Sequence, residues 1–161
     1  MATILNTNGD HLEVPVLNEM TTGTFYVITA DWNKDITYAL RDGAVEVLKK
    51  AGVESQKIKS LSVPGTVELV NIAGLCHKES DVAAIIVIGC VIRGDTPHFD
   101  YVCQIASQGV ANLNSKGDAP VVFGVLTVDT LEQAQQRAGG ILGNKGSEAA
   151  VAAIRMANLT I

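Results

Sequence analysis

Hydrophobic positions recur with two different periods along this chain, and the two periods alternate. Four runs of β-branched, aromatic and other apolar residues have the character of strands, and stretches with apolar residues three and four positions apart follow them. The runs predict strands over 25–30, 58–63, 83–91 and 121–126. The helical spacing predicts helices over 34–51, 67–77, 99–113, 131–138 and 147–159, with glycines interrupting the chain between the last two.

Four strand–helix units in succession predict an α/β fold. Residues 83–91 are nearly all Val, Ile and Ala, which is typical of a strand covered on both faces, as in a parallel sheet. Parallel strands need helical crossovers, and these are right-handed. We therefore expect residues 23–161 to form one three-layer α/β/α domain, with a four-stranded parallel sheet in the flavodoxin-like order.

Residues 1–22 do not fit this repeat, and we expect them to form an N-terminal arm. The segment 11–17 contains Pro15, a residue that sheets tolerate at their edges. We predict an edge strand over 11–17, one that can add to the sheet of a neighbouring subunit.

Composition favours a subunit of an oligomer. The chain has 161 residues, which is the length of one domain, and 47% of them are hydrophobic while 18% are charged. An ordinary soluble domain has about 25% charged residues, so this one has few with which to cover its surface. The net charge is −5 and no Lys/Arg stripe occurs, so nucleic-acid binding is not expected.

Nothing in the sequence predicts secretion or membrane insertion. The three cysteines form no CxxC pair, which favours small core residues in a reducing compartment. The first ten residues have neither the basic flank nor the apolar run of a signal peptide. The longest apolar stretch, Val82–Ile92, has eleven residues, whereas a membrane span needs about twenty. We expect a cytoplasmic protein with no membrane contact.

Three loop residues are candidates for chemistry, because ligands of parallel sheets bind beyond the C-terminal ends of the strands. Trp32 is either a hydrophobic anchor under the following helix or a wall on which a flat heterocycle stacks. Glu68 either interacts with its helix dipole, which the pattern alone favours, or accepts hydrogen bonds from substrate hydroxyls. His98 is either an ordinary residue of a helix start or an imidazole that moves protons near neutral pH.

The loop before the third predicted helix is a further candidate, in this case for binding phosphate. Free N–H groups at a helix start bind anions, but Asp95 disfavours a phosphate there without a second cation. Arg137 and Lys145 near the glycines can supply that charge, with simple surface solvation as the alternative. Neither GxxxxGK[ST] nor GxGxxG occurs, and no ligand spacing indicates a metal site. The residues thus predict a site for a planar or phosphate-bearing small molecule.

Taken together, four segments resemble the lumazine synthase family. They are VPGTVEL at 63–69, GCVIRGDTPHFDYV at 89–102, FGVLTVDTLEQAQQRAG at 123–139 and GNKGSEAA at 143–150. The resemblance implies condensation of 5-amino-6-(D-ribitylamino)pyrimidine-2,4-dione with 3,4-dihydroxy-2-butanone 4-phosphate, with no metal and no organic cofactor. The products are 6,7-dimethyl-8-ribityllumazine, phosphate and water, in the penultimate step of riboflavin biosynthesis.

The resemblance also implies roles for individual residues. It places proton transfer on His98 and phosphate binding on Asp95, Thr96, Arg137 and Lys145. It assigns the pyrimidine ring and ribityl chain to Trp32, Asn33, Thr66, Val67, Glu68, Val91, Ile92 and Phe123. In the family, Phe123, Arg137 and Lys145 reach the site from the neighbouring subunit. The sequence departs from the family at two positions, with Trp32 where Phe is frequent and Val67 where an aromatic residue is frequent.

Assembly follows from the same resemblance. Family members form pentamers, and some build a shell of twelve pentamers. Lys145 follows Arg137 by eight positions, the compact spacing of shell-forming members, so the resemblance favours the sixty-subunit shell. Riboflavin synthase is the implied pathway partner. Two other functions stay open, namely a flavodoxin-like flavin-binding module and a catalytically silent shell-forming scaffold.

Overall fold

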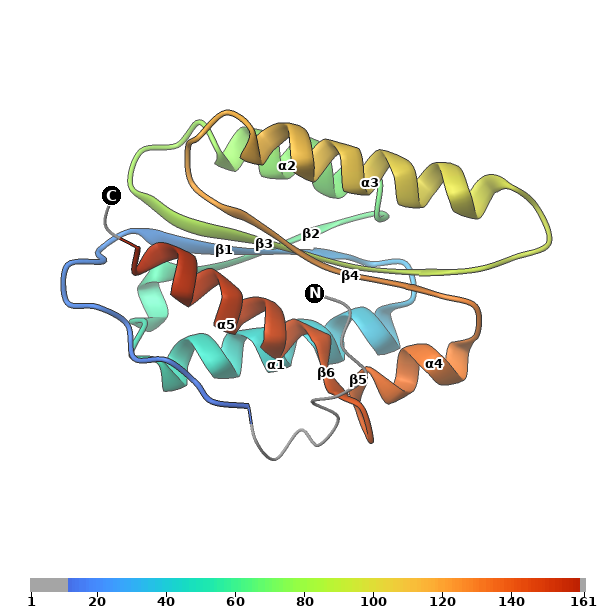
Figure 1. The fold of residues 1–161 in the computed structure, drawn as a ribbon, viewed down its shortest axis with the longest axis horizontal. Helices are drawn as coiled ribbons and strands as arrows, with labels where there is room; N and C mark the ends of the chain where they lie inside the picture. The colour runs from blue at the N-terminus through green and yellow to red at the C-terminus, as the bar shows by residue number, and fades with distance from the viewer. Residues whose placement is uncertain (1–11, 160–161) are drawn as a thin grey trace.

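A four-stranded parallel sheet forms the middle layer of the fold (Figure 1). In the computed structural model, which describes residues 12–159, the strand order is β2-β1-β3-β4 and every pairing is parallel. The strands are β1 (Thr24–Ala30), β2 (Ile58–Val63), β3 (Val82–Ile92) and β4 (Val121–Val128). The α/β class and the flavodoxin-like order predicted from the sequence are confirmed.

Helices cover both faces of the sheet. Two lie on one face, α1 (Lys34–Lys50) and α5 (Lys145–Ala157), and two on the other, α2 (Glu68–Cys76) and α3 (His98–Asn114), as Figure 1 shows. The remaining elements are short: the 3-10 helix η2 (Ser55–Lys57), α4 (Leu131–Gln136), β5 (Ala138–Gly140) and β6 (Gly143–Asn144). The glycine-rich break between the last two predicted helices is an antiparallel hairpin of β5 and β6.

Among the residues that the structure describes, the edge strand expected over 11–17 does not pair with the sheet of its own chain, and its addition to the sheet of a neighbouring subunit stays a prediction. Residues 12–17 form no strand, and His11 lies outside the described residues. The segment is fastened instead to the helical layer, since Leu17 N–H donates to Ala51 O at 2.8 Å. The amide of Asn158, just after α5, donates to Val16 O and accepts from Asn18 N–H, both at 2.9 Å. These bonds occupy backbone groups that a sheet ladder would use. The division into an arm of 1–22 and a domain of 23–161 stays a prediction.

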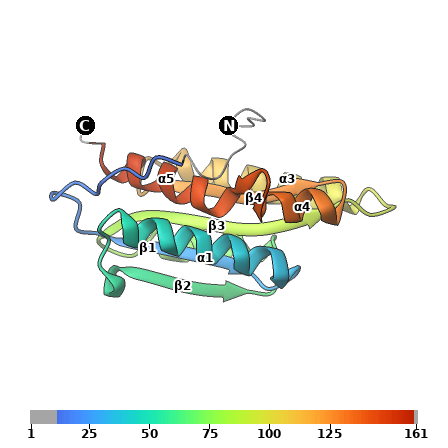
Figure 2. The ribbon, with the colours of Figure 1, turned by 90° about the horizontal axis from the view of Figure 1, so that it is seen from below.

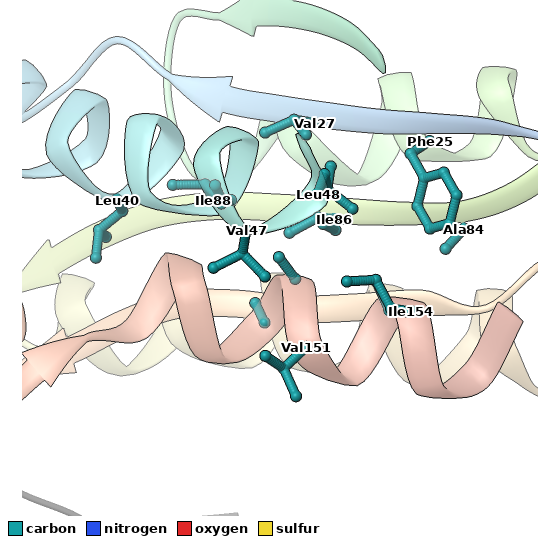
Figure 3. Close-up of a cluster of buried hydrophobic side chains, with 14 of the residues drawn as sticks. Phe25, Val27, Leu40, Val47, Leu48, Ala84, Ile86, Ile88, Val151 and Ile154 are labelled. Atoms are coloured by element: carbon teal, nitrogen blue, oxygen red, sulfur yellow. The ribbon is translucent and has the colours of Figure 1, made fainter. Parts of the chain in front are cut away.

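The core is divided by the sheet into two layers. Alternate strand residues face opposite sides, so Phe25 and Val27 pack toward α1 and α5 while Tyr26 and Ile28 pack toward α2 and α3. Figure 3 shows the larger layer, where Leu40 and the other side chains of α1 and α5 meet the sheet. Residues 84–90 of β3 are all buried, which confirms the prediction of a strand covered on both faces.

Cysteine side chains contribute to these layers. Cys90 lies in the layer under α1 and α5, and Cys76 lies in the other. Burial raises the pKa of the Cys90 thiol to about 11, so it is uncharged and unreactive at neutral pH. Cys103 on α3 is half-buried. Two of the three cysteines are therefore the small core residues that the sequence predicted.

The backbones of α1 and α5 approach each other closely where α5 begins. A Cβ atom on Gly146 would lie 1.9 Å from the carbonyl oxygen of Leu40 in α1. Only glycine can occupy this position unless the two helices separate. This contact sets where the start of α5 lies on α1.

We expect Gly146→Ala to lower the free energy of unfolding by about 3 kcal/mol or more, because the added methyl forces the helices apart. Gly74→Ala in α2 is the matched control, since its Cβ would lie 3.7 Å from the nearest atom, a methyl carbon of Leu113. That change should stabilise the protein by about 0.5–1 kcal/mol through helix propensity. Urea unfolding at one fixed protein concentration measures both. Similar effects of the two substitutions would contradict the close helix contact.

Candidate active site

The four loops that follow the C-terminal ends of the strands lie at one end of the sheet (Figures 1 and 2). Backbone hydrogen bonds continue between neighbouring loops beyond the strands themselves. Asp31 N–H donates to Val63 O at 2.8 Å, and Trp32 N–H donates to Pro64 O at 3.1 Å. Arg93 N–H donates to Val128 O at 2.9 Å. The sheet therefore fixes the starting point of each loop relative to its neighbours.

Trp32 stands exposed at the end of β1. Its side chain is 73% exposed, so it does not anchor α1 to the sheet. It lines a hollow of about 470 Å³ together with the other residues of the segment 31–36 and Leu131. An exposed aromatic plane beside a hollow fits stacking on a flat ligand.

Asn33 fixes the turn between β1 and α1. Its backbone is left-handed, with φ 60°, and its side-chain amide donates to Cys90 O in β3 at 2.9 Å. Asparagine tolerates this backbone conformation better than most residues. The amide therefore connects the start of α1 with the end of β3, where Val91 and Ile92 are half-buried.

Asp31 has a partner that the sequence did not reveal. The hydroxyl of Tyr38, one turn along α1, donates to Asp31 Oδ1 at 2.8 Å. This hydrogen bond raises the pKa of Tyr38. The guanidinium of Arg41 lies 4.2 Å from the centre of the Tyr38 ring. The group holds the Asp31 carboxylate beside Trp32.

The loop after β2 brings Thr66, Val67 and Glu68 to the same end of the sheet. Thr66 is buried against β3, where a Cβ on Gly89 would lie 2.8 Å from Thr66 Oγ1. Glu68 opens α2, and its carboxylate folds back over Gly65, since a Cβ there would lie 2.9 Å from Glu68 Oε2. The position in the first turn suits the helix dipole, so both interpretations of Glu68 remain open.

The loop after β3 projects from the molecule, as Figure 2 shows. Asp95 and Thr96 are exposed, and they precede the start of α3, whose first N–H groups have no partner inside the helix. His98 is the first residue of α3 and is exposed. His77, in contrast, is buried at the end of α2, with its ring Nε2 2.8 Å from Ala119 O.

Arg93 ties this loop to its neighbours. Its Nε lies 3.0 Å from Asp129 Oδ1 in the loop after β4, and its Nη1 lies 3.2 Å from Asp100 Oδ1 in the first turn of α3. Its guanidinium carbon stacks 4.0 Å from the centre of the Phe99 ring. The hydrogen bond to Asp129 raises the pKa of Arg93. Because two carboxylates already neutralise Arg93, it adds little positive charge for a phosphate.

Phe123 lies away from the loops of its own chain. It lies on the edge strand β4, where it pairs with Val87 in the middle of β3, and it is half-buried against the layer of α2 and α3. The single chain therefore does not bring Phe123 together with Trp32 or His98. The resemblance assigned this residue to the site of a neighbouring subunit.

Arg137 and Lys145 share a carboxylate that was not among the candidates from the sequence. Arg137 forms two hydrogen bonds with Glu148, from Nη1 at 2.7 Å and Nη2 at 2.9 Å, and Nη1 also donates to Leu142 O at 2.5 Å. Lys145 Nζ lies 3.5 Å from Glu148 Oε2. The three-residue spacing of Lys145 and Glu148 on one helix is the sequence signal that could have indicated the pair.

Glu148 neutralises only half of this positive charge. Burial alone would raise the pKa of Glu148, but Arg137 and Lys145 together outweigh burial and lower it. The carboxylate is thus ionised at neutral pH. Two cations against one carboxylate leave one positive charge, and the three side chains are only 21–31% exposed. We call Arg137, Lys145 and Glu148 the cation group.

The described residues 12–159 hold no cluster of three His, Cys, Asp or Glu side chains suited to a metal ion. None of their helices has the length and apolar character needed to cross a bilayer.

Comparison with known proteins finds one family. Residues 22–160 match the family described as 6,7-dimethyl-8-ribityllumazine synthase. A protein of that name from Bacteroides fragilis is 54% identical over 132 residues, which are 82% of this chain and 92% of the relative. Another, from Parabacteroides distasonis, is 48% identical over 151 residues, which are 94% of this chain and 92% of the relative. A third, from Cytophaga hutchinsonii, is 46% identical over 149 residues, 92% of each chain.

We expect Glu148→Gln to lower the free energy of unfolding by about 1 kcal/mol at neutral pH, because the ion pair is partly exposed to solvent. The folded-state pKa of Glu148 is below its usual value, so its stabilisation is present at neutral pH and is lost as the pH falls through the folded-state pKa. The difference between wild type and variant should therefore shrink in acid. Urea unfolding from about pH 7 to about pH 3 measures it.

Glu132→Gln is the control for this experiment. Glu132 is exposed on α4, and no ion pair involves it within residues 12–159. Its substitution should change stability little at any pH. A difference for Glu148→Gln that stays constant in acid would show that its ionisation does not stabilise the fold.

Proposed function

The chain belongs to the 6,7-dimethyl-8-ribityllumazine synthase family, and from this we propose how its residues carry out the reaction. The protein is a transferase of riboflavin biosynthesis. It condenses 5-amino-6-(D-ribitylamino)pyrimidine-2,4-dione with 3,4-dihydroxy-2-butanone 4-phosphate and releases 6,7-dimethyl-8-ribityllumazine, phosphate and water. The observation that carries the proposal is the exposed Trp32 at the sheet end that also presents His98.

Trp32 stacks on the pyrimidine ring in this proposal. Its exposed plane at the hollow of segment 31–36 supports the role. Asn33 lies beside the ring, and its hydrogen bond to Cys90 O sets the spacing between Trp32 and the apolar wall of Val91 and Ile92. Thr66, Val67 and Glu68 bind the ribityl chain and the ring edge.

The phosphate of the second substrate lies at the start of α3. Backbone N–H groups of Asp95 and Thr96 donate to it, as helix starts do for anions. Arg93 contributes little, since its charge is balanced by Asp100 and Asp129. Arg137 and Lys145 of the neighbouring subunit supply the compensating charge, and the net positive charge of the cation group supports this.

His98 moves protons. The 5-amino group attacks the ketone and loses water to form an imine, which then loses an α-proton and expels phosphate. The ribitylamino nitrogen attacks the remaining carbonyl carbon and a second water leaves to close the ring, so each step transfers a proton. An imidazole titrates in the range that these steps need. His98 is exposed at the start of α3, two residues after Thr96, and so stands next to the proposed phosphate. Holding the two substrates together supplies much of the remaining acceleration.

The site is completed by a neighbouring subunit, which contributes Phe123, Arg137 and Lys145. The distance of Phe123 from the loops of its own chain supports this arrangement. Exposed apolar side chains on α2 and α3, among them Leu75, Tyr101 and Ile105, supply surface for contacts between subunits. We propose pentamers, twelve of which form a shell.

The cell compartment and the pathway partner belong to the same proposal. Both substrates are polar and one carries a phosphate, so neither crosses a lipid bilayer unaided. The protein therefore acts in the cytoplasm, where such metabolites are made. Riboflavin synthase, which consumes the lumazine, is its pathway partner.

Mixing the purified protein with both substrates tests the assignment directly. The expected result is the fluorescence of the lumazine, which requires both substrates. A flavin-binding module would instead purify yellow with bound flavin, and a silent scaffold would assemble without forming product. Either result would overturn the proposal.

We expect His98→Ala to lower the turnover number by one to two orders of magnitude, at or below the lower end of the roughly 10²–10⁴-fold range for general acid–base groups. The substituted residue is exposed, so stability should be unaffected. Steady-state kinetics from about pH 6 to about pH 8 measure the effect. A variant with the turnover of the wild type across this range would remove His98 from the mechanism.

We expect the protein to form a particle near sixty times the mass of one chain. The compact β5–β6 hairpin between Arg137 and Lys145 supports this, since an insertion there would obstruct contacts between pentamers. Light scattering or native mass spectrometry measures the mass. A species of five or ten subunits at every pH and phosphate concentration would refute the shell and leave the enzyme assignment intact.

A further inference from the structure

Asn144 joins the start of α5 to the middle of α1. Its side-chain Nδ2 donates to Ala39 O in α1 at 2.9 Å. Its Oδ1 accepts from Ser147 N–H at 3.0 Å and so caps α5. One amide therefore uses its donor toward one helix and its acceptor toward the other.

The amide is enclosed where it crosses α1. A Cβ on Gly43 would lie 2.6 Å from Asn144 Nδ2 and 2.7 Å from its Oδ1. Gly146, two residues along the chain, makes the backbone contact with Leu40 described above. Two glycines, one on each helix, thus leave room for one asparagine side chain.

Asn144 is also directly connected to the cation group. It pairs with Ala138 across the β5–β6 hairpin, so it lies opposite the residue that follows Arg137. The two cations are themselves linked through the backbone, since Lys145 N–H donates to Arg137 O at 2.9 Å. Glu148 follows one turn later on the helix that Asn144 caps. A shift of Asn144 therefore moves both cations and their carboxylate.

The bond to Ala39 is the hydrogen bond that holds this unit on the rest of the domain at that point. Among the hydrogen bonds of residues 12–159, no other joins residues 137–148 to α1. Other backbone hydrogen bonds connect the hairpin to α4, such as Leu142 N–H to Gln136 O at 3.1 Å. Packing of α5 on the sheet fixes the helix axis, and the close approach of Gly146 to Leu40 and the Asn144 amide together fix the position of its first turn.

We propose that Asn144 is a positioning residue for the phosphate half of the reaction, acting through Arg137 and Lys145. The proposal rests on the phosphate role of these cations given above. The Asn144 donor holds the cation group in the place where it meets the phosphate of the butanone substrate. The cap on Ser147 serves the stability of α5 instead.

Asn144→Ser separates these two roles. A serine hydroxyl still accepts from the N–H groups of a helix start, but it is too short to reach Ala39 O. We expect this variant to raise the KM for the butanone phosphate by about 2- to 12-fold, the equivalent of one neutral hydrogen bond. The KM for the pyrimidine should stay within experimental error. Calorimetric titration with inorganic phosphate, a product of the reaction, should show the same loss of affinity.

Asn114→Ser is the matched control. Asn114 in α3 also bridges two elements, donating to Val110 O and Val121 O and accepting from Val121 N–H. It lies where β4 begins, at the other end of the strand from the loops. Its substitution should cost stability without changing either KM or the affinity for phosphate. An equal rise of both KM values in Asn144→Ser, or the same KM split in Asn114→Ser, would reduce Asn144 to a structural residue.

Arg137→Ala distinguishes failure of this inference from failure of the function on which it rests. A charge-assisted contact is equivalent to about 10- to 150-fold in affinity, so this variant should raise the KM for the butanone phosphate by that factor. An unchanged KM in Arg137→Ala would overturn the phosphate role itself. A raised KM in Arg137→Ala with an unchanged one in Asn144→Ser would overturn only the role of Asn144.

Discussion

Burial of both faces of a parallel sheet is the constraint on which the rest of the molecule depends. Because the strands are parallel, each crossover returns the chain to the end of the sheet where the strands begin. The loops that follow all four strands therefore lie together at the opposite end. The apolar run of β3 can exist only where helices cover it from both sides. The loops at this end can therefore be exposed and polar, because packing holds the sheet behind them.

Hydrogen bonds beyond the strand ends hold these four loops in fixed positions relative to one another. Backbone bonds connect the first and second loops, and Asn33 connects the first with the end of β3. Arg93 connects the third loop with the fourth through Asp129. Arg93 is balanced by two carboxylates and so holds loops together, whereas Arg137 and Lys145 share the single carboxylate of Glu148 and keep one unbalanced positive charge.

Local patterns predicted most of the fold because strands and helices depend mainly on period. The run over 83–91 and the helix over 34–51 needed no knowledge of their neighbours. The described part of the segment 11–17 pairs with no strand of its own chain, because a segment with strand character becomes a strand only where a sheet edge binds it, and its pairing with a neighbouring subunit stays a prediction. Asn158, almost the whole chain away, binds the backbone of this segment instead.

Candidate site residues were found from their place in loops, whereas their partners were not. Trp32, Glu68 and His98 could be singled out because each follows a predicted strand. The spacing on one helix could have paired Glu148 with Lys145, but the contacts of Glu148 with Arg137 and of Asp129 with Arg93 are decided by how α5 and the fourth loop pack in three dimensions. The exposure of Trp32 likewise depends on the fold, and it separates the two interpretations that the sequence left open.

That exposed indole is the only tryptophan in the chain. The ultraviolet emission of the protein therefore comes almost entirely from one side chain in the hollow at the sheet end. Since the indole is already in water, unfolding alters its surroundings little, and its emission is a poor monitor of denaturation. A flat heterocycle stacked on the ring would quench it. If a ligand stacks there, as proposed above, the protein carries an intrinsic optical reporter of ligand binding whose emission changes little on unfolding.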